Sequence, residues 1–206
     1  MPNRNQDVSP KKEDRRVTYT KMALRDALVE LMREKHISGI TVKSICALAD
    51  VNRSTFYLHY RDQYDLLHQI EYEVLETLQA RLQDRQDAQD TRPVTLKVMT
   101  EILEYARENA ALARVLLSEN CDFAFQQDIM ELAEILALWM DPSYNERVRD
   151  YVTVYGISGC IAIAERWLKD GTIEQPEEIA QLILQVLYNG LSSFAKPPRH
   201  TEPAPT

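Results

Sequence analysis

The residues best equipped for chemistry are clustered between positions 53 and 59, where five side chains can donate hydrogen bonds: Arg53, Ser54, Thr55, Tyr57 and His59. Such side chains bind phosphate oxygens and the edges of nucleic-acid bases. An arginine can bind the O6 and N7 atoms of a guanine, which gives about 1–3 kcal/mol of discrimination between bases. For Arg53 a base contact and a phosphate contact both stay open, and for Tyr57 and His59 the alternative is surface packing. The cluster predicts a nucleic-acid-binding surface.

Two short helices are expected to position these side chains. Thr41 is a candidate N-cap for the first, whose inward face would hold Val42, Ile45, Cys46 and Ala49. A turn at 50–52 follows, and Asn52 can cap the second helix, from Arg53 to Tyr60. A longer helix over 18–35 precedes them, and another, capped by Asp62, follows. This arrangement is the geometry of a helix-turn-helix DNA reader, although other short helical hairpins show similar patterns.

The remainder of the folded chain also has helical periodicity. We find no alternating strand pattern, and the sequence predicts five further helices at Val94–Asn109, Ala110–Ser118, Phe123–Met140, Asn145–Lys169 and Pro176–Phe194. The ends, 1–16 and 196–206, are polar or rich in proline and are expected to be disordered. The predicted fold class is all-α.

The formal net charge of −8 hides an asymmetry between the two parts of the chain. Residues 1–66 hold twelve Lys and Arg against nine Asp and Glu, a balance of +3, and the remaining residues hold twelve against twenty-three, a balance of −11. A mildly basic head on an acidic body suits a protein that presents one end to phosphates.

Other classes of protein find little support in the sequence. The three cysteines form no close pairs, the four histidines show no metal-ligand spacing, and we expect no metal or cofactor. The segment 156–159 resembles a nucleophile elbow, but its second glycine is one position early and no strand precedes it, so we expect no enzyme. No apolar segment is long enough for a membrane span and no secretory signal is visible, which predicts a cytoplasmic protein with no membrane partner.

The stretch Gly39-Ile-Thr-Val-Lys-Ser-Ile-Cys-Ala-Leu-Ala-Asp-Val-Asn-Arg-Ser-Thr-Phe-Tyr-Leu-His-Tyr-Arg-Asp-Gln-Tyr-Asp-Leu-Leu67 closely resembles the DNA-binding domain of the TetR family of regulators. A second stretch, from Tyr155 through Trp167-Leu168-Lys169-Asp170-Gly171 to Ala180, is similar to the C-terminal region of a TetR subgroup common in Firmicutes. The two matches cover about half of the chain.

This resemblance implies roles for individual residues at the expected DNA surface. Tyr57 matches a tyrosine that reaches DNA, and Thr55 and His59 match residues that contact phosphate. Lys43 stands where a basic residue often contacts DNA, and Arg53 and Ser54 stand at the variable positions that read bases.

Two positions depart from the family pattern. Asp50 replaces the glycine at which the chain turns into the left-handed conformation, and its charge is unfavourable at a helix C-terminus and near phosphates. Gln63 replaces a phosphate-binding lysine, which would reduce the salt dependence of binding by up to about one unit of log–log slope. Both departures put the affinity for DNA in question, and the basic residues near the N-terminus are a possible compensation.

The resemblance further implies a helix-turn-helix domain over 17–66 and a helical effector-binding and dimerisation domain over 67–195. An unidentified small-molecule effector is expected in the second domain, with candidate lining residues Met99, Tyr105, Phe123, Trp139, Tyr151, Tyr155 and Trp167. Aromatic residues at helical spacing are also common in protein cores. Gly156 and Gly159 would allow close approach either of a partner subunit or of another helix in the same chain.

The expected function is therefore a DNA-binding transcription regulator, a homodimeric repressor released from a palindromic operator by its effector. Two half-sites about 34–36 Å apart would match the two recognition helices. The alternative is a TetR-like protein that has lost DNA binding and acts as a protein-binding coactivator.

Overall fold

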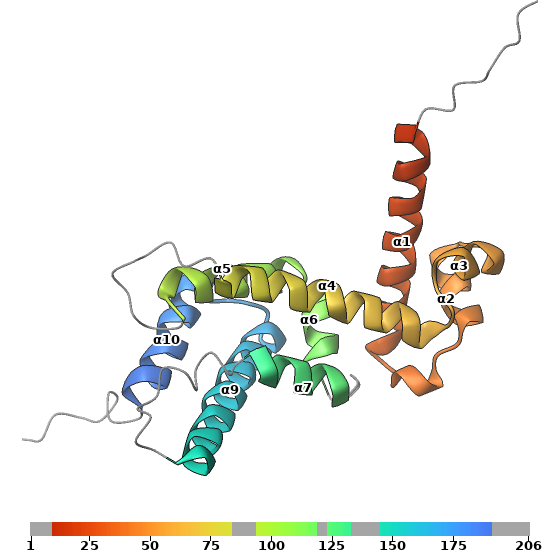
Figure 1. Cartoon of the computed structure of the whole chain (residues 1–206). Helices are drawn as coiled ribbons and strands as arrows, with labels where there is room; N and C mark the ends of the chain where they lie inside the picture. The colour runs from red at the N-terminus through yellow and green to blue at the C-terminus, as the bar shows by residue number, and fades with distance from the viewer. Residues whose placement is uncertain (1–9, 84–93, 119–122, 133–144, 191–206) are drawn as a thin grey trace, which may run out of the picture. The chain divides into compact units, whose positions relative to one another are not determined.

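The computed structural model describes residues 10–83, 94–118, 123–132 and 145–190, and all regular structure in these residues is helical, as the sequence predicted (Figure 1). Two compact units divide the chain, one comprising residues 1–83 and 109–132 and the other residues 84–108 and 133–206. None of the helices in the described ranges is long and apolar enough to cross a membrane.

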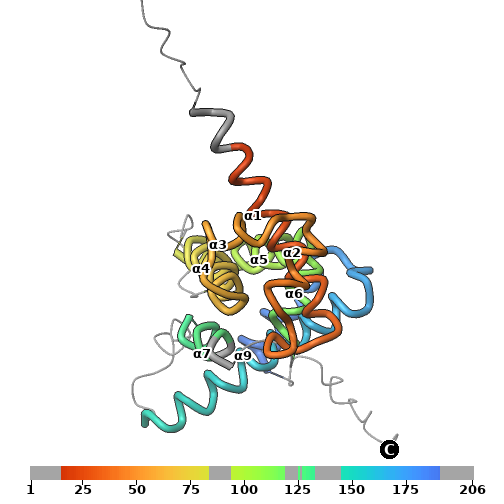
Figure 2. Tube along the Cα trace, turned by 90° about the vertical axis from the view of Figure 1, so that its right-hand side faces the viewer, coloured from red at the N-terminus to blue at the C-terminus, as the bar shows by residue number. Residues whose placement is uncertain are grey.

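The first unit begins with α1 (Pro10–Met32), a short 3-10 helix (Ile37–Gly39), α2 (Val42–Ala49), α3 (Arg53–His59) and α4 (Gln63–Gln83), and is completed by α6 (Ala110–Leu116) and α7 (Phe123–Leu132). Helix α1 packs against α2, α4 and α6, while α7 packs against α4 (Figure 1 and Figure 2). The side chains that fill this core are almost completely buried and come from four helices: Leu24, Leu28, Met32, Ile45, Phe56, Leu66 and Leu67.

The start of α1 corrects the sequence prediction. The helix begins at Pro10 rather than near Thr18, so residues 10–16 belong to a helix and not to a disordered arm. Proline is tolerated at a first helical position because its missing N–H has no partner there in any helix. The lysines, arginines and glutamate that follow Pro10 have good helix propensity, which outweighs the absence of an apolar stripe.

The N-caps of α2 and α4 are the residues that the sequence predicted. Thr41 Oγ1 accepts a hydrogen bond from the Ser44 N–H over 3.1 Å, and Ser44 Oγ accepts one from the Thr41 N–H over 3.1 Å, so the first turn of α2 has a reciprocal capping box. Asp62 Oδ1 accepts from the Asp65 N–H over 2.9 Å and caps α4, as expected.

The described helices of the second unit are α5 (Leu96–Glu108), α9 (Glu146–Lys169) and α10 (Pro176–Asn189). Helix α10 packs against both α5 and α9. The Tyr188 hydroxyl donates a hydrogen bond to the Val94 carbonyl over 2.9 Å, and Trp167 Nε1 donates one to the Glu174 carbonyl over 3.1 Å. These contacts fix the start of α5 and the turn between α9 and α10.

Gly156 on α9 lies against α10. A Cβ atom at this position would stand 2.9 Å from Leu187 Cδ1, whereas a Cβ at Gly159 would meet nothing within 4 Å. Of the two roles that the sequence left open, Gly156 therefore has the intramolecular one, because α10 occupies the space that a side chain would need.

Apart from the start of α1 and the end of α10, the helix ends agree with the prediction within a few residues wherever they can be compared. The expected helix end at Met140 lies outside the described residues. The last helix was predicted to reach Phe194, but α10 ends at Asn189, where Gly190 is its C-cap with a positive φ of 63°. The division into two compact units follows contacts along the whole chain and groups α6 and α7 with the helices of 10–83. The boundary expected between residues 66 and 67, and the disordered tail from 196, stay predictions.

Candidate nucleic-acid interface

Helices α2 and α3 are joined by a tight turn at Asp50, Val51 and Asn52, as predicted. Asp50 has the left-handed conformation, with φ 52° and ψ 42°. The N–H groups of Asp50 and Val51 both donate to the Cys46 carbonyl and close the end of α2. Asn52 Oδ1 accepts from the Ser54 N–H over 3.0 Å and starts α3. The turn therefore fixes the direction in which α3 leaves α2.

One face of α3 anchors the helix in the first unit. Phe56 is completely buried, and its ring lies 5.5 Å from that of Tyr57 and 5.6 Å from that of Tyr60. The pKa of the Tyr60 phenol is raised, mainly by burial and also by the nearby carboxylates of Glu73 and Asp65. The buried rings of Phe56 and Tyr60 hold α3 against the core, and the opposite face of the helix is exposed.

That opposite face carries three of the predicted site residues. Arg53, Ser54 and Tyr57 are exposed, and 52% of Tyr57 is accessible to solvent. Their spacing along the helix places them on the same side. Thr55 and His59 are half-buried and lie on the flank of α3 rather than on its outer face.

The Ser54 hydroxyl is already engaged inside the turn. Its Oγ donates a hydrogen bond to Asn52 Oδ1 over 3.0 Å, in addition to the bond from the Ser54 N–H to the same oxygen. A hydroxyl has only one hydrogen to donate, so in this conformation Ser54 presents an acceptor to a ligand.

Lys43, the remaining predicted DNA contact, lies on α2 and is exposed. It lines the same shallow hollow of about 450 Å³ as Arg53, with the turn between them. Asp50 also lines this hollow, so a carboxylate shares it with the two cations. The structure thus brings Lys43, Arg53 and the unfavourable charge of Asp50 to one place.

Two further residues on this surface were not among the predicted contacts. Leu58 is 79% exposed, and the periodicity of α3 places it beside Ser54 on the outer face. The spacing of four residues between Ser54 and Leu58 indicates in the sequence that the two share a face, but not that this face is exposed. Arg61, directly after α3, has a side chain that is 88% exposed.

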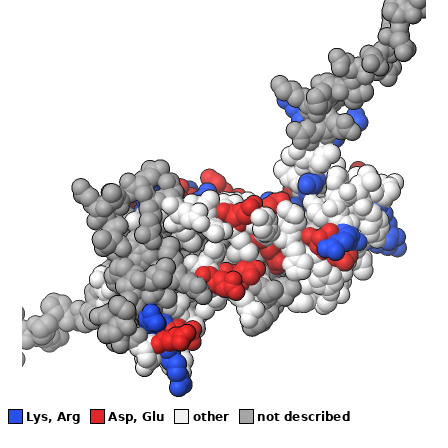
Figure 3. Space-filling model, in the orientation of Figure 1, with Lys and Arg blue, Asp and Glu red and all other residues white. Residues whose placement is uncertain are grey.

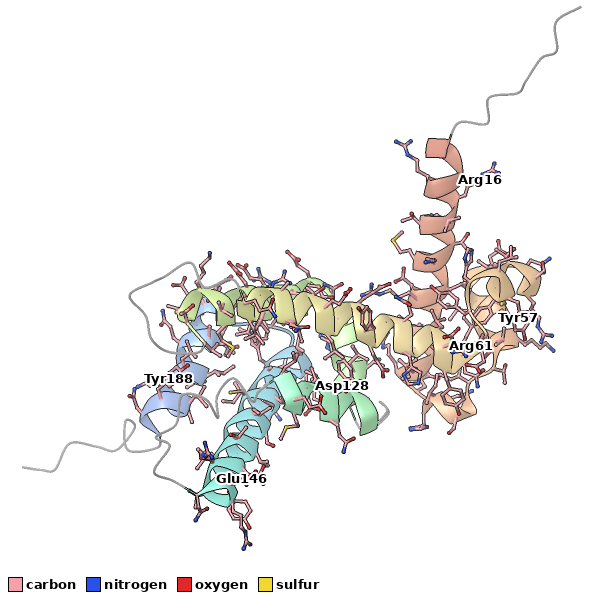
Figure 4. The ribbon with its side chains drawn as sticks, in the orientation of Figure 1. Arg16, Tyr57, Arg61, Asp128, Glu146 and Tyr188 are labelled. Carbon is pink, nitrogen blue, oxygen red and sulfur yellow. The ribbon has the colours of Figure 1, made fainter. Side chains whose placement is uncertain are left out.

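Arg61 supplies positive charge next to the start of α4, where Gln63 stands (Figure 4). Its N–H donates to Asp65 Oδ2 over 2.8 Å and its Nη2 to Asp65 Oδ1 over 3.2 Å. The backbone hydrogen bond, followed by the side-chain hydrogen bond, lowers the pKa of the Asp65 carboxyl. Asp65 thereby holds the guanidinium at the end of α3.

The charges of the first unit are unevenly distributed. In the view of Figure 3, Lys and Arg side chains lie over the end of this unit that holds α2 and α3, while Asp and Glu side chains gather along α4. Arg16, near the start of α1, adds a cation on the turns that project beyond α3 (Figure 4). The sequence placed the change from basic to acidic composition after residue 66, and in the structure the acidic side chains gather along α4, which contains that position.

The candidate effector residues are not brought together as a set. Met99 and Trp167 are buried in the second unit and Tyr105 is half-buried on α5, whereas Tyr151 and Tyr155 are 61% and 64% exposed on α9. Phe123 is the first residue of α7, in the first unit, and Trp139 lies outside the described residues. Among the described side chains no group of three His, Cys, Asp or Glu could hold a metal ion.

Comparison with known proteins places this interface in context. Residues 95–189 match a TetR-type family model described as the transcriptional regulator C-terminal region. An uncharacterised HTH-type transcriptional regulator of Bacillus subtilis (strain 168), YxbF, is 24% identical over 166 residues, 80% of this chain. The chain spans only 43% of the length of that relative.

Solved structures share the fold. A TetR transcriptional regulator from Streptococcus agalactiae superimposes with a TM-score of 0.59 at 24% identity, covering 87% of this chain and 99% of that one. FadR from Bacillus subtilis, solved with stearoyl-CoA, gives a TM-score of 0.63 at 16% identity, covering 82% and 98%. The family model on the C-terminal helices and the HTH-type relative make this chain similar to transcriptional regulators of the TetR type.

Proposed function

We propose that this regulator binds a palindromic DNA operator through the outer face of α3, as a homodimeric repressor released by a small-molecule effector. The observation that carries the proposal is the exposed group of Arg53, Ser54 and Tyr57 on a helix whose other face is fixed by the buried Phe56. A rigid helix that presents a cation, an acceptor and an aromatic hydroxyl fits the major groove of DNA.

Lys43, Thr55, His59 and Arg61 are the proposed phosphate contacts around this helix. Lys43 and Arg61 are exposed cations on either side of α3 in the chain, and Thr55 and His59 lie on its flank. Phosphate contacts orient a protein on the duplex, whereas base contacts give it sequence specificity. Arg61 is the proposed substitute for the lysine that Gln63 replaces.

Dimerisation is proposed to use the outer face of α9. Exposed apolar or small residues recur there at helical spacing over about four turns: Val148, Tyr151, Val152, Tyr155, Gly159 and Ala162. A continuous exposed face of this composition is typical of a surface that a partner covers. A symmetric pair of subunits would present two α3 helices to two half-sites.

Control by an effector would follow from the same architecture. A ligand that binds better to a conformation in which the two α3 helices no longer match the half-sites shifts the population away from DNA. The solved relative FadR holds stearoyl-CoA, which supports a small-molecule effector for this chain as well.

The test is an electrophoretic mobility shift with genomic fragments selected for binding. Arg53→Ala is expected to cost about 1–3 kcal/mol of binding free energy on the selected site and to relax its specificity. Arg33→Ala is the matched control, because Arg33 is an exposed arginine of the same unit that pairs with Glu30 at the far end of α1. Tyr57→Ala is compared with Tyr72→Ala, an exposed tyrosine on α4.

Two outcomes would contradict the proposal. If no genomic fragment binds at low salt, the coactivator alternative replaces it, and a protein partner should then be sought. If fragments bind but Arg53→Ala and Tyr57→Ala change nothing, the DNA-binding surface is not α3.

A further inference from the structure

Two polar atoms on one side of α9 are buried and have no partner. Among the described residues, Arg149 Nε and Thr153 Oγ1 are shielded from solvent without a hydrogen bond to any group. The two residues are four positions apart, so their side chains lie one above the other on the helix. Buried donors without acceptors are rare in folded proteins, and each asks for an explanation.

Arg149 does not form an ion pair with the nearby carboxylate of Glu146. Glu146 stands three residues before it and is exposed, which is the spacing at which Glu30 pairs with Arg33 over 2.8 Å. Such a pair on a helix surface forms easily in water. The Nε–H of Arg149 is instead turned to the shielded side, where Thr153 has its hydroxyl.

This side of α9 continues into the interior of the second unit. Gly156 and Ile157, three and four positions after Thr153, are buried. Gly156 lies against Leu187. Farther along the same side, burial raises the pKa of the Cys160 thiol to about 11, as expected in apolar surroundings. The cation and the hydroxyl therefore stand at the end of an apolar face, opposite the exposed face of Tyr151 and Tyr155.

We propose that Arg149 and Thr153 bind an oxyanion, the carboxylate or phosphate of an organic effector whose apolar part lies along α9. An arginine presents N–H groups in a planar fork that matches two oxygens of such an anion, and the threonine hydroxyl adds a third donor. The anion supplies the acceptors that both atoms lack. This inference rests on the proposed control by an effector and adds its chemical class.

Isothermal titration of the full-length protein with three probes tests the site: sodium decanoate, decyl phosphate and decanol. Binding of decanoate, decyl phosphate or both is expected, and the stronger of the two identifies the source of the oxyanion. Arg149→Gln should weaken that binding about tenfold or more, and Thr153→Val about fivefold. Decanol, which has no charge, should bind weakly and equally to the wild type and to Arg149→Gln.

Arg147→Gln is the matched control, because Arg147 is exposed on the same turn of α9 and donates to the Tyr151 hydroxyl over 3.2 Å. It should leave the affinity for either anion unchanged. The proposal is overturned if neither anion binds the wild type, if Arg149→Gln binds them as the wild type does, or if Arg147→Gln loses the same affinity.

A second measurement needs no ligand. A shielded N–H without an acceptor costs free energy in the free protein, so Arg149→Met should melt at the same temperature as the wild type or higher. It should also leave the oligomeric state in light scattering unchanged. A marked fall in melting temperature or dissociation of the oligomer would show that Arg149 has a structural partner, and would overturn the proposal.

Operator binding separates this proposal from the proposed function. Arg149→Gln without ligand should bind DNA like the wild type, and decanoate or decyl phosphate should no longer release it. If the wild type binds no DNA but the calorimetric pattern holds, the proposed function fails and the oxyanion site stands. If DNA is bound and the calorimetric pattern fails, only the oxyanion site is lost.

Discussion

Gly156 on α9 and Leu187 on α10 pack so closely that a Cβ atom on Gly156 would stand 2.9 Å from Leu187 Cδ1. This distance is shorter than real Cβ contacts, so a side chain there would force α10 or the Leu187 rotamer to move. We expect Gly156→Ala to lower the free energy of unfolding by up to about 2 kcal/mol, measured by urea denaturation, because an overpacking cost of about 1–3 kcal/mol is offset by about 1 kcal/mol of helix propensity. The loss should be independent of protein concentration.

Gly159→Ala is its matched control, since a Cβ there meets nothing within 4 Å in the same chain. Alanine favours helix by about 1 kcal/mol over glycine. Any loss of stability in Gly159→Ala should therefore depend on protein concentration, because it would come from the proposed contact with a second subunit. Equal effects of both substitutions would show that Leu187 adapts to the added methyl group.

Trp167 is expected to stabilise the turn between α9 and α10 rather than to recognise an effector. Trp167→Phe removes the hydrogen bond from Nε1 to the Glu174 carbonyl and leaves that carbonyl without its donor. The expected loss is about 1–3 kcal/mol of unfolding free energy. Glu174→Ala should have little effect, because the acceptor is the backbone, and a stable Trp167→Phe with altered effector response would contradict this assignment.

Asp50 is expected to weaken DNA binding through its charge. Asp50→Asn keeps a residue that tolerates φ 52° and removes a carboxylate from the hollow lined by Lys43 and Arg53. Affinity for the selected operator should rise about two- to fivefold, from ~0.3–1 kcal/mol of electrostatic free energy. The gain should shrink as salt is added, and Asp128→Asn, an exposed aspartate on α7, should give none.

Leu58 is expected to make an apolar contact with DNA. Its side chain is 79% exposed, so Leu58→Ser should leave the melting temperature unchanged. Loss of contact with a thymine methyl group or a sugar should weaken operator binding by about 1 kcal/mol, measured by fluorescence anisotropy. Ile173→Ser, at a residue that is 77% exposed in the turn before α10, is the control and should leave affinity unchanged.

Asp65 is expected to make stability depend on pH in the acid range. Its pKa lies below the ordinary 3.8 in the folded protein, because the Arg61 N–H and guanidinium donate to the carboxylate. A lowered folded-state pKa means that the stabilisation is complete well above pH 3.8 and is lost as the pH falls through the folded value. The stability difference between the wild type and Asp65→Asn should shrink between about pH 6 and pH 3, and a constant difference would contradict the assignment.

The sequence alone was sufficient for the existence of the helices and for the turn at residues 50–52. Each follows from local rules: Thr41, Asn52 and Asp62 carry the oxygens that cap helices, and apolar residues at helical spacing define the inward faces. It missed the early start of α1, because helix propensity without an apolar stripe gives no periodic signal. It also missed the exposure of Leu58, because the residue type alone does not show whether a leucine is buried or exposed.

Other features depended on tertiary contacts between residues far apart in the sequence. Gly156 and Gly159 differ in the space around them because α10 packs against Gly156 but not against Gly159. The exposure of Tyr151 and Tyr155 and the burial of Trp167 divide one helix into two faces that the sequence could not distinguish, since all three are aromatic. The sequence could not show that Arg149 Nε and Thr153 Oγ1 lack hydrogen-bond partners. Water satisfies a polar side chain unless the fold excludes it, and only the tertiary structure shows where water is excluded.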